Sequence, residues 1–444
     1  MNFKGTLNRN KDIVQNVVFA FIVRGLSMIV SLFTMPAYIR YFQNQTVLGL
    51  WFTILSVLNW VLMFDLGLGN GLRNKLPHAL AENDYDKAKK YISSTYLSVI
   101  VLIAVLSALS MLVFRFIPWN TIFNIDYSLI SHEVLVQSVK IVFIGIMLQF
   151  LLKLIASILY ALQRSSIVNF LSLLSSILIY IFVRMAPSSG LEQNLVRMSW
   201  VNVFAVNIPL IAATVIIFST KLKNCRPSFK MYSKKYAREI LKIGGVLLWL
   251  QIVFMVISST NEFLISHLTS PDSVVEYQIY FKIFNAFSSI FSLALVPIWS
   301  AVTKAHAEKS YSWIMKLYNL LLIMAALAFM VELAIVPFLQ WLVNIWLQGS
   351  SITVKMPYAI AIAISNSIFV LHNVNTSLGN GMSYFKTQII WMSFAALVDI
   401  PLAYLFVNLT GSWIGVIIAN IIALLPYEIL EPIYLKRFIK RQFN

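Results

Sequence analysis

The chain of 444 residues is 59% hydrophobic and 11% charged, with a mean hydropathy of +0.80. This composition excludes an ordinary soluble protein, whose surface needs a larger share of charged and polar residues. The net charge of +17 does not indicate nucleic-acid binding, because the aromatic residues lie inside apolar runs and not among the basic ones. The single cysteine, Cys225, excludes an intrachain disulfide.

Twelve apolar runs are long enough to cross a membrane as helices, which takes about 20 residues each. The segment before the first run is polar, and that run is too long for a signal-peptide core, so we expect it to be retained. The predicted class is all-α, a polytopic membrane protein with about 12 transmembrane helices. The spans are predicted at 17–39, 46–68, 91–117, 136–162, 167–187, 194–219, 244–266, 278–301, 314–338, 356–378, 388–408 and 411–434.

Lysine and arginine predict the orientation, since cytoplasmic loops of membrane proteins keep positive charge. With the N-terminus inside, 25 of the 34 basic residues fall in inner segments and three in outer loops, while six lie within spans. We therefore expect both termini to be cytoplasmic.

The most basic inner segment divides the spans six and six. We predict a six-helix lobe over 1–220, a cytoplasmic linker over 221–243 and a second six-helix lobe over 244–444. Within the linker, 232–243 can form an amphipathic helix with Tyr236, Ile240 and Leu241 on one side, suited to the membrane surface.

An internal echo supports two related halves. Five residues after span two recur 226 positions later, after span eight: Ala79, Ala81, Glu82, Tyr85 and Lys90 correspond to Ala305, Ala307, Glu308, Tyr311 and Lys316. Both segments fall in inner loops, so the halves would be parallel repeats. Two like lobes around a central cavity are the predicted architecture of a transporter.

No motif indicates catalysis or a metal or other cofactor. The five histidines are scattered, and no HExxH, GxSxG or phosphate-cradling glycine loop is present. The longest outer loop, about 116–136, is too short for an external catalytic domain, which disfavours a polysaccharide polymerase or acyltransferase.

Basic residues inside spans are the strongest candidates for a binding site, since a charge in the bilayer needs a partner or a wet cavity. Arg24 lies about 12 Å into the first span at the helical rise, and we favour a cavity role over a structural ion pair. For Lys153, a cavity role and a structural role are equally favoured. Snorkelling to the outer surface competes with a cavity-mouth role for the remaining four: Lys140, Arg184, Arg197 and Lys282.

Acidic residues inside spans are candidates for proton or cation coupling. Asp399 is the deepest, and pairing with a basic residue is the competing interpretation. Glu262 and Asp65 lie nearer span ends and are weaker candidates, as is Glu332, while Glu428 and Glu431 lie in the last span near its predicted inner end.

Span ten carries Asn366 and Asn373 on one face, with His372 and Asn375 nearby. Hydrogen bonding between helices is the favoured interpretation and sugar recognition the alternative.

Glycines cluster at two predicted inner span ends. Gly67, Gly69 and Gly71 follow span two, and Gly379 and Gly381 follow span ten. Such glycines would end the helix and suit a hinge, or serve as a plain helix stop.

The stretch 65–74, Asp-Leu-Gly-Leu-Gly-Asn-Gly-Leu-Arg-Asn, followed by Ala-Glu-Asn-Asp-Tyr-Asp-Lys-Ala, resembles the inner loop after span two of polysaccharide exporters. These exporters belong to the multidrug/oligosaccharidyl-lipid/polysaccharide exporter superfamily. The length and the twelve-span plan are similar over the whole chain, which most resembles bacterial O-antigen repeat-unit flippases. Lipid II flippases carry additional spans.

The resemblance implies a protein of the bacterial inner membrane and no enzyme. Its partners would be membrane lipid and its substrate, an undecaprenyl-diphosphate-linked oligosaccharide moved from the cytoplasmic to the periplasmic leaflet by alternating access. In similar flippases a basic cavity receives the diphosphate and the sugars, often with an arginine of the first span, where Arg24 lies. The alternative is a cation-coupled multidrug exporter of the same fold, which would depend on carboxylates such as Asp399.

Overall fold

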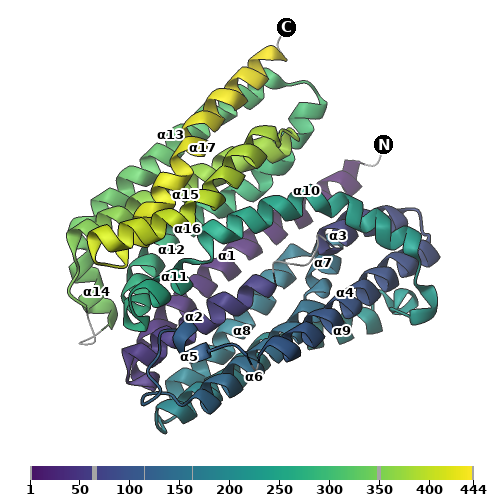
Figure 1. Cartoon of the computed structure of the whole chain (residues 1–444). Helices are drawn as coiled ribbons and strands as arrows, with labels where there is room; N and C mark the ends of the chain where they lie inside the picture. The colour runs from purple at the N-terminus through teal and green to yellow at the C-terminus, as the bar shows by residue number, and fades with distance from the viewer. Residues whose placement is uncertain (1–2, 63–67, 115, 163, 348–351, 443–444) are drawn as a thin grey trace. The chain divides into compact units, whose positions relative to one another are not determined.

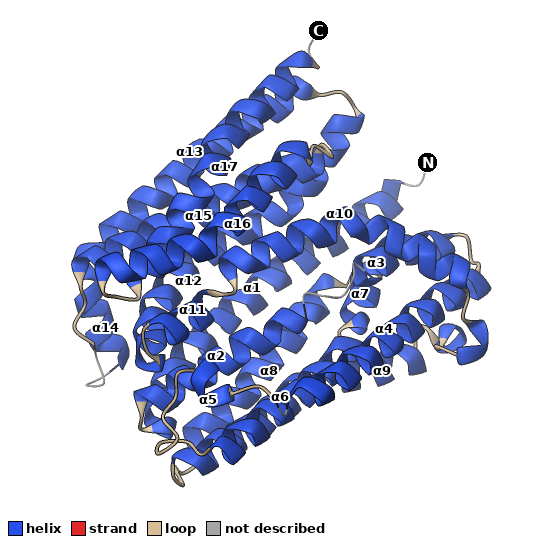
Figure 2. Ribbon diagram, viewed as in Figure 1, coloured by secondary structure: helices blue, strands red, loops and turns tan. Residues whose placement is uncertain are grey.

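The apolar runs form long helices. A computed structural model describes residues 3–62, 68–114, 116–162, 164–347 and 352–442, which contain helices and connecting loops but no strand (Figure 2). The α-helices are α1 Phe3–Phe42, α2 Gln45–Val61, α3 Leu68–Ala81, α4 Tyr85–Phe114, α5 Trp119–Ile122, α6 His132–Leu152, α7 Leu154–Ala161, α8 Ser165–Met185, α9 Leu191–Ser219, α10 Lys234–Ser258, α11 Asn261–Leu268, α12 Pro271–Ala307, α13 Tyr311–Ile335, α14 Leu339–Leu347, α15 Met356–Gly381, α16 Lys386–Thr410 and α17 Ile414–Arg441. Short 3-10 turns are η1 Lys223–Cys225, η2 Phe229–Met231 and η3 Val336–Phe338.

Ten stretches of the described chain are long and apolar enough to cross a membrane, and each corresponds to one predicted span. The other two predicted spans correspond to α2, a shorter apolar helix of 17 residues, and to α12, which has 37 residues. Large apolar side chains stay exposed along these helices; Leu397 and Leu112, for example, are 76% and 68% exposed. Such surfaces suit a lipid surrounding. The predicted all-helical polytopic class is confirmed.

The chain clusters into two compact units. Unit 1 comprises Met1–Val47 and Ile54–Gln251, and unit 2 comprises Leu48–Thr53 and Ile252–Asn444. The amphipathic helix predicted over 232–243 is not a separate element, because its residues form the first turns of α10, which runs on to Ser258. The division into two six-helix lobes with a linker stays a prediction.

In unit 1, α1 packs along α8, α6 along α9, and α3 against α4 and α7 (Figure 1). The C-terminal end of α1 is held by Tyr41, whose ring meets Phe182 edge-on at 5.6 Å and whose carbonyl accepts a 3.1 Å hydrogen bond from the Asn194 amide. These buried contacts join the C-terminal end of α1 to the end of α8 and the start of α9.

In unit 2, α16 and α17 form a hairpin, and α15 packs against α12, α13 and α17 (Figure 1). Gly411 (φ +61°) ends α16 in the left-handed conformation that glycine adopts without strain, and α17 begins three residues later. Two apolar clusters form the core. One joins α12, α13, α15 and α17, and the other joins the end of α10 to α15, α16 and α17.

The two echoed loops have the same backbone geometry. In unit 1 Asn83 is left-handed (φ 55°), and the Asp84 amide donates to the Ala79 carbonyl at 3.0 Å. In unit 2 the equivalent Lys309 is left-handed (φ 57°), and Ser310 donates to Ala305 at 2.8 Å. This is the αL ending of a helix. The sequence echo therefore encodes one turn, used once in each unit.

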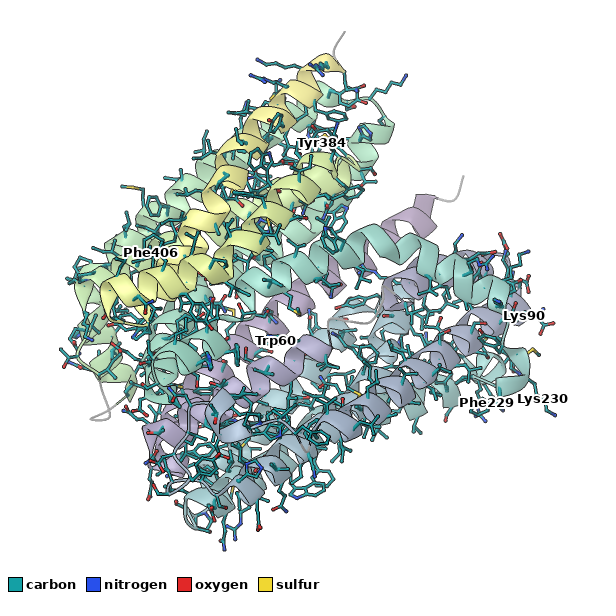
Figure 3. The ribbon with its side chains drawn as sticks, viewed as in Figure 1. Trp60, Lys90, Phe229, Lys230, Tyr384 and Phe406 are labelled. Carbon is teal, nitrogen blue, oxygen red and sulfur yellow. The ribbon has the colours of Figure 1, made fainter. Side chains whose placement is uncertain are left out.

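Close packing of the α16–α17 hairpin predicts a strong effect at Gly415. A Cβ there would collide with the backbone of Val407 and Phe406 (Phe406 is labelled in Figure 3). We expect Gly415→Ala to lower the free energy of unfolding by about 1–3 kcal/mol, the usual cost of overpacking, measured as a lower melting temperature in detergent. Gly25→Ala is the control, because a Cβ on Gly25 meets nothing within 4 Å; equal melting of both variants would contradict the packing.

The lone thiol is shielded. Cys225 on η1 is 1% exposed, its Sγ lies 3.7 Å from the Tyr85 carbonyl, and burial raises the pKa of the thiol. Because only the exposed thiolate reacts rapidly, we expect a hydrophilic maleimide to label native protein at least about tenfold more slowly than protein unfolded in dodecyl sulfate. Equal rates would show that this segment does not pack on α4.

Candidate functional site

Two arginines of unit 1 converge on one tyrosine. The Arg73 guanidinium, on α3, lies over the Tyr160 ring of α7 at 4.6 Å from its centroid, and Arg24 of α1 acts electrostatically on the same tyrosine. Both arginines are exposed, and neither is paired with a carboxylate within the described residues. We call Arg24, Arg73 and Tyr160 the arginine cluster. Two guanidinium groups without a carboxylate partner among the described residues are suited to an anion such as a phosphate.

Packing of α3 sets the position of Arg73. Gly69 and Gly71 lie inside α3, and a Cβ on Gly71 would collide with Ile240 of α10, so this glycine permits close approach of the two helices. The prediction that this stretch ends span two is wrong, because α2 already ends at Val61 and α3 begins at Leu68. Asp65 and Gly67 lie outside the described residues, and a coupling or hinge role for them stays a prediction.

The other predicted cations of unit 1 do not join the arginine cluster through any contact seen among the described residues. Lys153 is exposed at the break between α6 and α7, Lys140 is exposed on α6, and Arg184 is exposed near the end of α8. The Arg184 carbonyl accepts a hydrogen bond from Arg40, while Arg197 donates to Ser189 at 2.5 Å. Cavity roles for these residues stay predictions.

In unit 2, Lys282 is near a predicted coupling residue. It is half-buried on α12 and interacts electrostatically with Glu262 of α11, which also accepts a 2.7 Å hydrogen bond from Gln278. The cavity-mouth role of Lys282 and the coupling role of Glu262 stay predictions.

Asp399 has an amide partner. The residue is fully buried on α16 and accepts a 2.8 Å hydrogen bond from Asn420 of α17, while its second oxygen has no hydrogen-bond partner among the described residues. No basic residue neutralises it there, and its role in proton or cation coupling stays a prediction.

Gly379 and Gly381 lie in the last turn of α15 and do not form its turn. The left-handed residue after the helix is Ser383 (φ 56°), and a Cβ on Gly381 would press on Val302 of α12. The glycines do lie at the end of the helix, since α15 ends at Gly381. Their hinge role stays untested.

Unit 2 also contains a polar cavity of about 180 Å³. Its wall combines amides, hydroxyls and aromatic rings and contains no charged side chain. The lining residues are Phe254, Ser258, Asn261, Tyr277, Phe281, Asn285, Ser288, Ser289, Ser292, Ile362, Ser365, Asn366, Phe369, Asn373 and Ile417, from α10, α11, α12, α15 and α17. We call it the amide cavity.

A buried carboxylate supports one side of the amide cavity. Glu332 on α13 is 1% exposed and accepts hydrogen bonds from Asn366 at 2.9 Å and Ser367 at 2.7 Å, both on α15. Ser288 of α12 donates to it at 3.1 Å. Asn373 donates to Ser292 of α12 at 3.2 Å. Both asparagines of the span-ten stripe thus make the interhelical bonds that the sequence favoured, and both also line a cavity.

A second buried network joins α13, α15 and α17. Glu428 accepts from Asn375 at 2.8 Å and lies 3.1 Å from His372 Nδ1, while Tyr318 donates to Asn375 at 2.7 Å. One turn further along α17 is Glu431, which is 1% exposed. Thr387 interacts with the Glu431 carboxylate, but neither oxygen has a partner at good hydrogen-bonding geometry among the described residues. We call these residues the glutamate network.

The sequence contains a signal for both buried polar clusters, in the positions of their acidic residues. Glu428 and Glu431 are three residues apart and so share a helix face, and Glu332 is an isolated charge in a long apolar run. Isolated span carboxylates need buried partners. Within the described residues, no group of three or more His, Cys, Asp or Glu side chains is placed to hold a metal ion.

Solved structures supply the comparison. Neither a protein-family model nor a curated protein sequence matches the chain. An inward-facing multidrug resistance MATE family transporter of the MOP superfamily is similar over 95% of this chain and 99% of its own, with TM-score 0.73 and 14% identity. An outward-facing structure described in the same terms gives TM-score 0.65 and 13% identity over 96% of both chains.

A third similar structure is a MOP superfamily transporter from Pyrococcus furiosus, described as having a binding pocket of reverse polarity that suggests a different function. It gives TM-score 0.63 and 16% identity over 97% of this chain and 96% of its own. The likeness supports the superfamily resemblance at the level of the fold, while the polysaccharide branch stays a prediction. The chain is an all-helical, multi-pass membrane protein with the fold of the MATE family transporters of the MOP superfamily.

Proposed function

We propose that the protein is a flippase that moves an undecaprenyl-diphosphate-linked oligosaccharide from the cytoplasmic to the periplasmic leaflet by alternating access. The arginine cluster carries this proposal. Arg24 of α1 and Arg73 of α3 have no carboxylate partner among the described residues, and both act electrostatically on Tyr160 of α7. The fold shared with MOP superfamily transporters is compatible with this activity.

The chemistry of the substrate explains the need for such a cluster. A diphosphate cannot enter hydrocarbon unaided, because it would lose its hydration without replacement. Guanidinium groups replace that hydration with paired, charge-assisted hydrogen bonds. The polyprenyl tail can remain in the bilayer while the head group moves.

Charge distribution supports the direction and the location. Lys90 of α4 and Lys230 of η2 lie at one end of unit 1 (Figure 3), where the basic start of α10 adds Lys234, Lys235 and Arg238. Positive charge is retained on the cytoplasmic side. This end would therefore face the cytoplasm of a bacterium, in its inner membrane, with both chain termini on the same side.

A cation-coupled multidrug exporter is the second candidate, favoured by the buried carboxylates of unit 2. Glu332, Asp399, Glu428 and Glu431 are all buried within apolar helices, and no lysine or arginine pairs with them among the described residues. Drug cations and coupling ions would both be attracted to such groups.

One reconstitution separates the two functions. Purified protein in vesicles receives either a fluorescent polyprenyl-diphosphate sugar, followed by its accessibility to an external quencher, or ethidium, followed by efflux under a proton or sodium gradient. We expect the lipid to equilibrate between leaflets at least about tenfold faster than in protein-free vesicles, with no ethidium efflux. Ethidium efflux without lipid movement would replace the flippase with the exporter.

A further inference from the structure

The size of the amide cavity limits what it can hold. An enclosed volume of about 150 Å³ accommodates one benzene ring in an engineered protein cavity. The amide cavity, at about 180 Å³, therefore has room for one six-membered ring with its substituents. It is much larger than a single ion requires.

Its unused polar atoms are mostly hydrogen-bond acceptors. Asn261 is 4% exposed, and its Oδ1 has no hydrogen-bond partner among the described residues, although its amide nitrogen lies 3.4 Å from the Tyr277 hydroxyl. Leaving a buried carbonyl unpaired costs about 1–3 kcal/mol. This cost would be relieved by a ligand that carries donors.

The two asparagines of α15 add further acceptors. The Asn366 nitrogen donates to Glu332 at 2.9 Å, and the Asn373 nitrogen donates to Ser292 at 3.2 Å. Both amide oxygens therefore remain for a ligand. Asn285 of α12 is half-buried and makes no side-chain hydrogen bond within the described chain, so it can both donate and accept.

Aromatic rings complete the lining. Phe254 and Phe369 meet edge-on, with centroids 6.0 Å apart, and Tyr277 and Phe281 stack at 5.4 Å. The face of an aromatic ring carries a negative potential, which attracts the slightly positive C–H face of a saturated ring. A charged ligand would find no ion-pair partner in this lining.

We propose that the amide cavity binds one neutral sugar ring of the transported head group. A pyranose fits the volume, its hydroxyls supply the donors that the asparagine oxygens require, and its C–H face suits the phenylalanines. This inference rests on the proposed function: it assigns sugar recognition to unit 2, separate from the arginine cluster that serves the diphosphate.

The binding experiment uses a thiol placed in the cavity wall. Ser289→Cys is a near-isosteric change at a half-buried lining position, and the native Cys225 is shielded. Labelling by a small methanethiosulfonate is timed without lipid, with sugar-free polyprenyl diphosphate, and with polyprenyl diphosphates that carry one glucose, galactose, N-acetylglucosamine or N-acetylgalactosamine.

We expect at least one sugar-bearing lipid to slow labelling about tenfold, while sugar-free lipid does not. The protection should weaken by about tenfold in affinity when Asn261→Ala or Asn285→Ala is added, because each removes a hydrogen-bonding group. Asn319→Ala is the matched control, since Asn319 is an exposed asparagine of α13 outside the cavity. In the Asn319→Ala variant, the sugar-bearing lipid should protect the thiol introduced by Ser289→Cys from labelling as well as it does without this change.

Equal labelling with all lipids, or slowing by sodium chloride but by no sugar, would overturn the proposal. The lipid-movement assay on unmodified protein reports separately on the flippase function. Protection of the thiol by a sugar-bearing lipid, without lipid movement between leaflets, would refute the flippase function and support the sugar site. Lipid movement without protection of the thiol would refute the sugar site and support the flippase function.

Discussion

Replacing both Arg24 and Arg73 with alanine is expected to slow translocation of a polyprenyl-diphosphate sugar at least about 100-fold. A hydrogen bond to a charged group contributes about 1.5–3 kcal/mol, and each 1.4 kcal/mol is a factor of ten. Two arginines that each contribute one such bond in the rate-limiting state therefore account for two or more orders of magnitude.

The same double substitution is expected to leave the protein folded. Both side chains are exposed, and within the described residues neither neutralises a carboxylate, so their removal strands no buried charge. The amount of monodisperse protein and its melting temperature in detergent measure this. Loss of transport together with loss of folded protein would remove the cluster from the mechanism.

Matched variants separate charge from geometry. Arg73→Lys keeps the charge but loses the planar fork and its stacking on Tyr160, so we expect an intermediate rate. Tyr160→Phe keeps the ring and should transport nearly normally. Lys230→Ala removes an exposed cation of η2 that makes no contact with the arginine cluster among the described residues, and it should have no effect.

Replacing Glu428 with alanine is expected to lower the free energy of unfolding of unit 2 by about 3–5 kcal/mol, the usual cost of breaking a buried ion pair or its hydrogen-bonded equivalent. Glu428 is 4% exposed and holds two buried partners, His372 and Asn375. Their polar atoms would be left facing a cavity. Thermal or dodecyl sulfate unfolding in detergent micelles measures the loss.

Glu428→Gln is the control for this prediction. Its carbonyl can still accept from Asn375 and its amide can donate to His372, so we expect less than half of the loss seen with alanine. Equal stability of the wild-type protein and Glu428→Ala would show that the glutamate network does not hold α15 to α17.

Long apolar spans were predictable because a run of 20 or more apolar residues has few alternatives to a membrane helix. The prediction that Gly69 and Gly71 end a helix was wrong, because both lie inside α3. Local sequence cannot distinguish a glycine that lets the backbone turn from a glycine that lets a neighbouring helix pack closely. Gly71 is of the second kind, because it allows Ile240 of α10 to pack against α3.

The candidate sites were predictable as isolated residues but not as groups. Arg24 stood out because a charge in a span is costly, whereas Arg73 appeared to be an ordinary inner-loop residue until α3 placed it over Tyr160. Glu332 finds its partners on helices far along the chain, at Ser288 and Asn366. Periodicity within one helix gives no information about such pairs.

Equilibrium binding of sugar-free polyprenyl diphosphate in detergent micelles tests the role of Arg24 and Arg73 most directly, because it involves neither turnover nor the sugar. The dissociation constant is measured for wild-type protein, for the Arg24→Ala, Arg73→Ala double variant and for Lys230→Ala, which removes an exposed cation of η2. We expect the double variant to bind about 100-fold more weakly, and Lys230→Ala to match the wild type. Equal affinity of all three would contradict the assignment of these two guanidinium groups to an anionic head group.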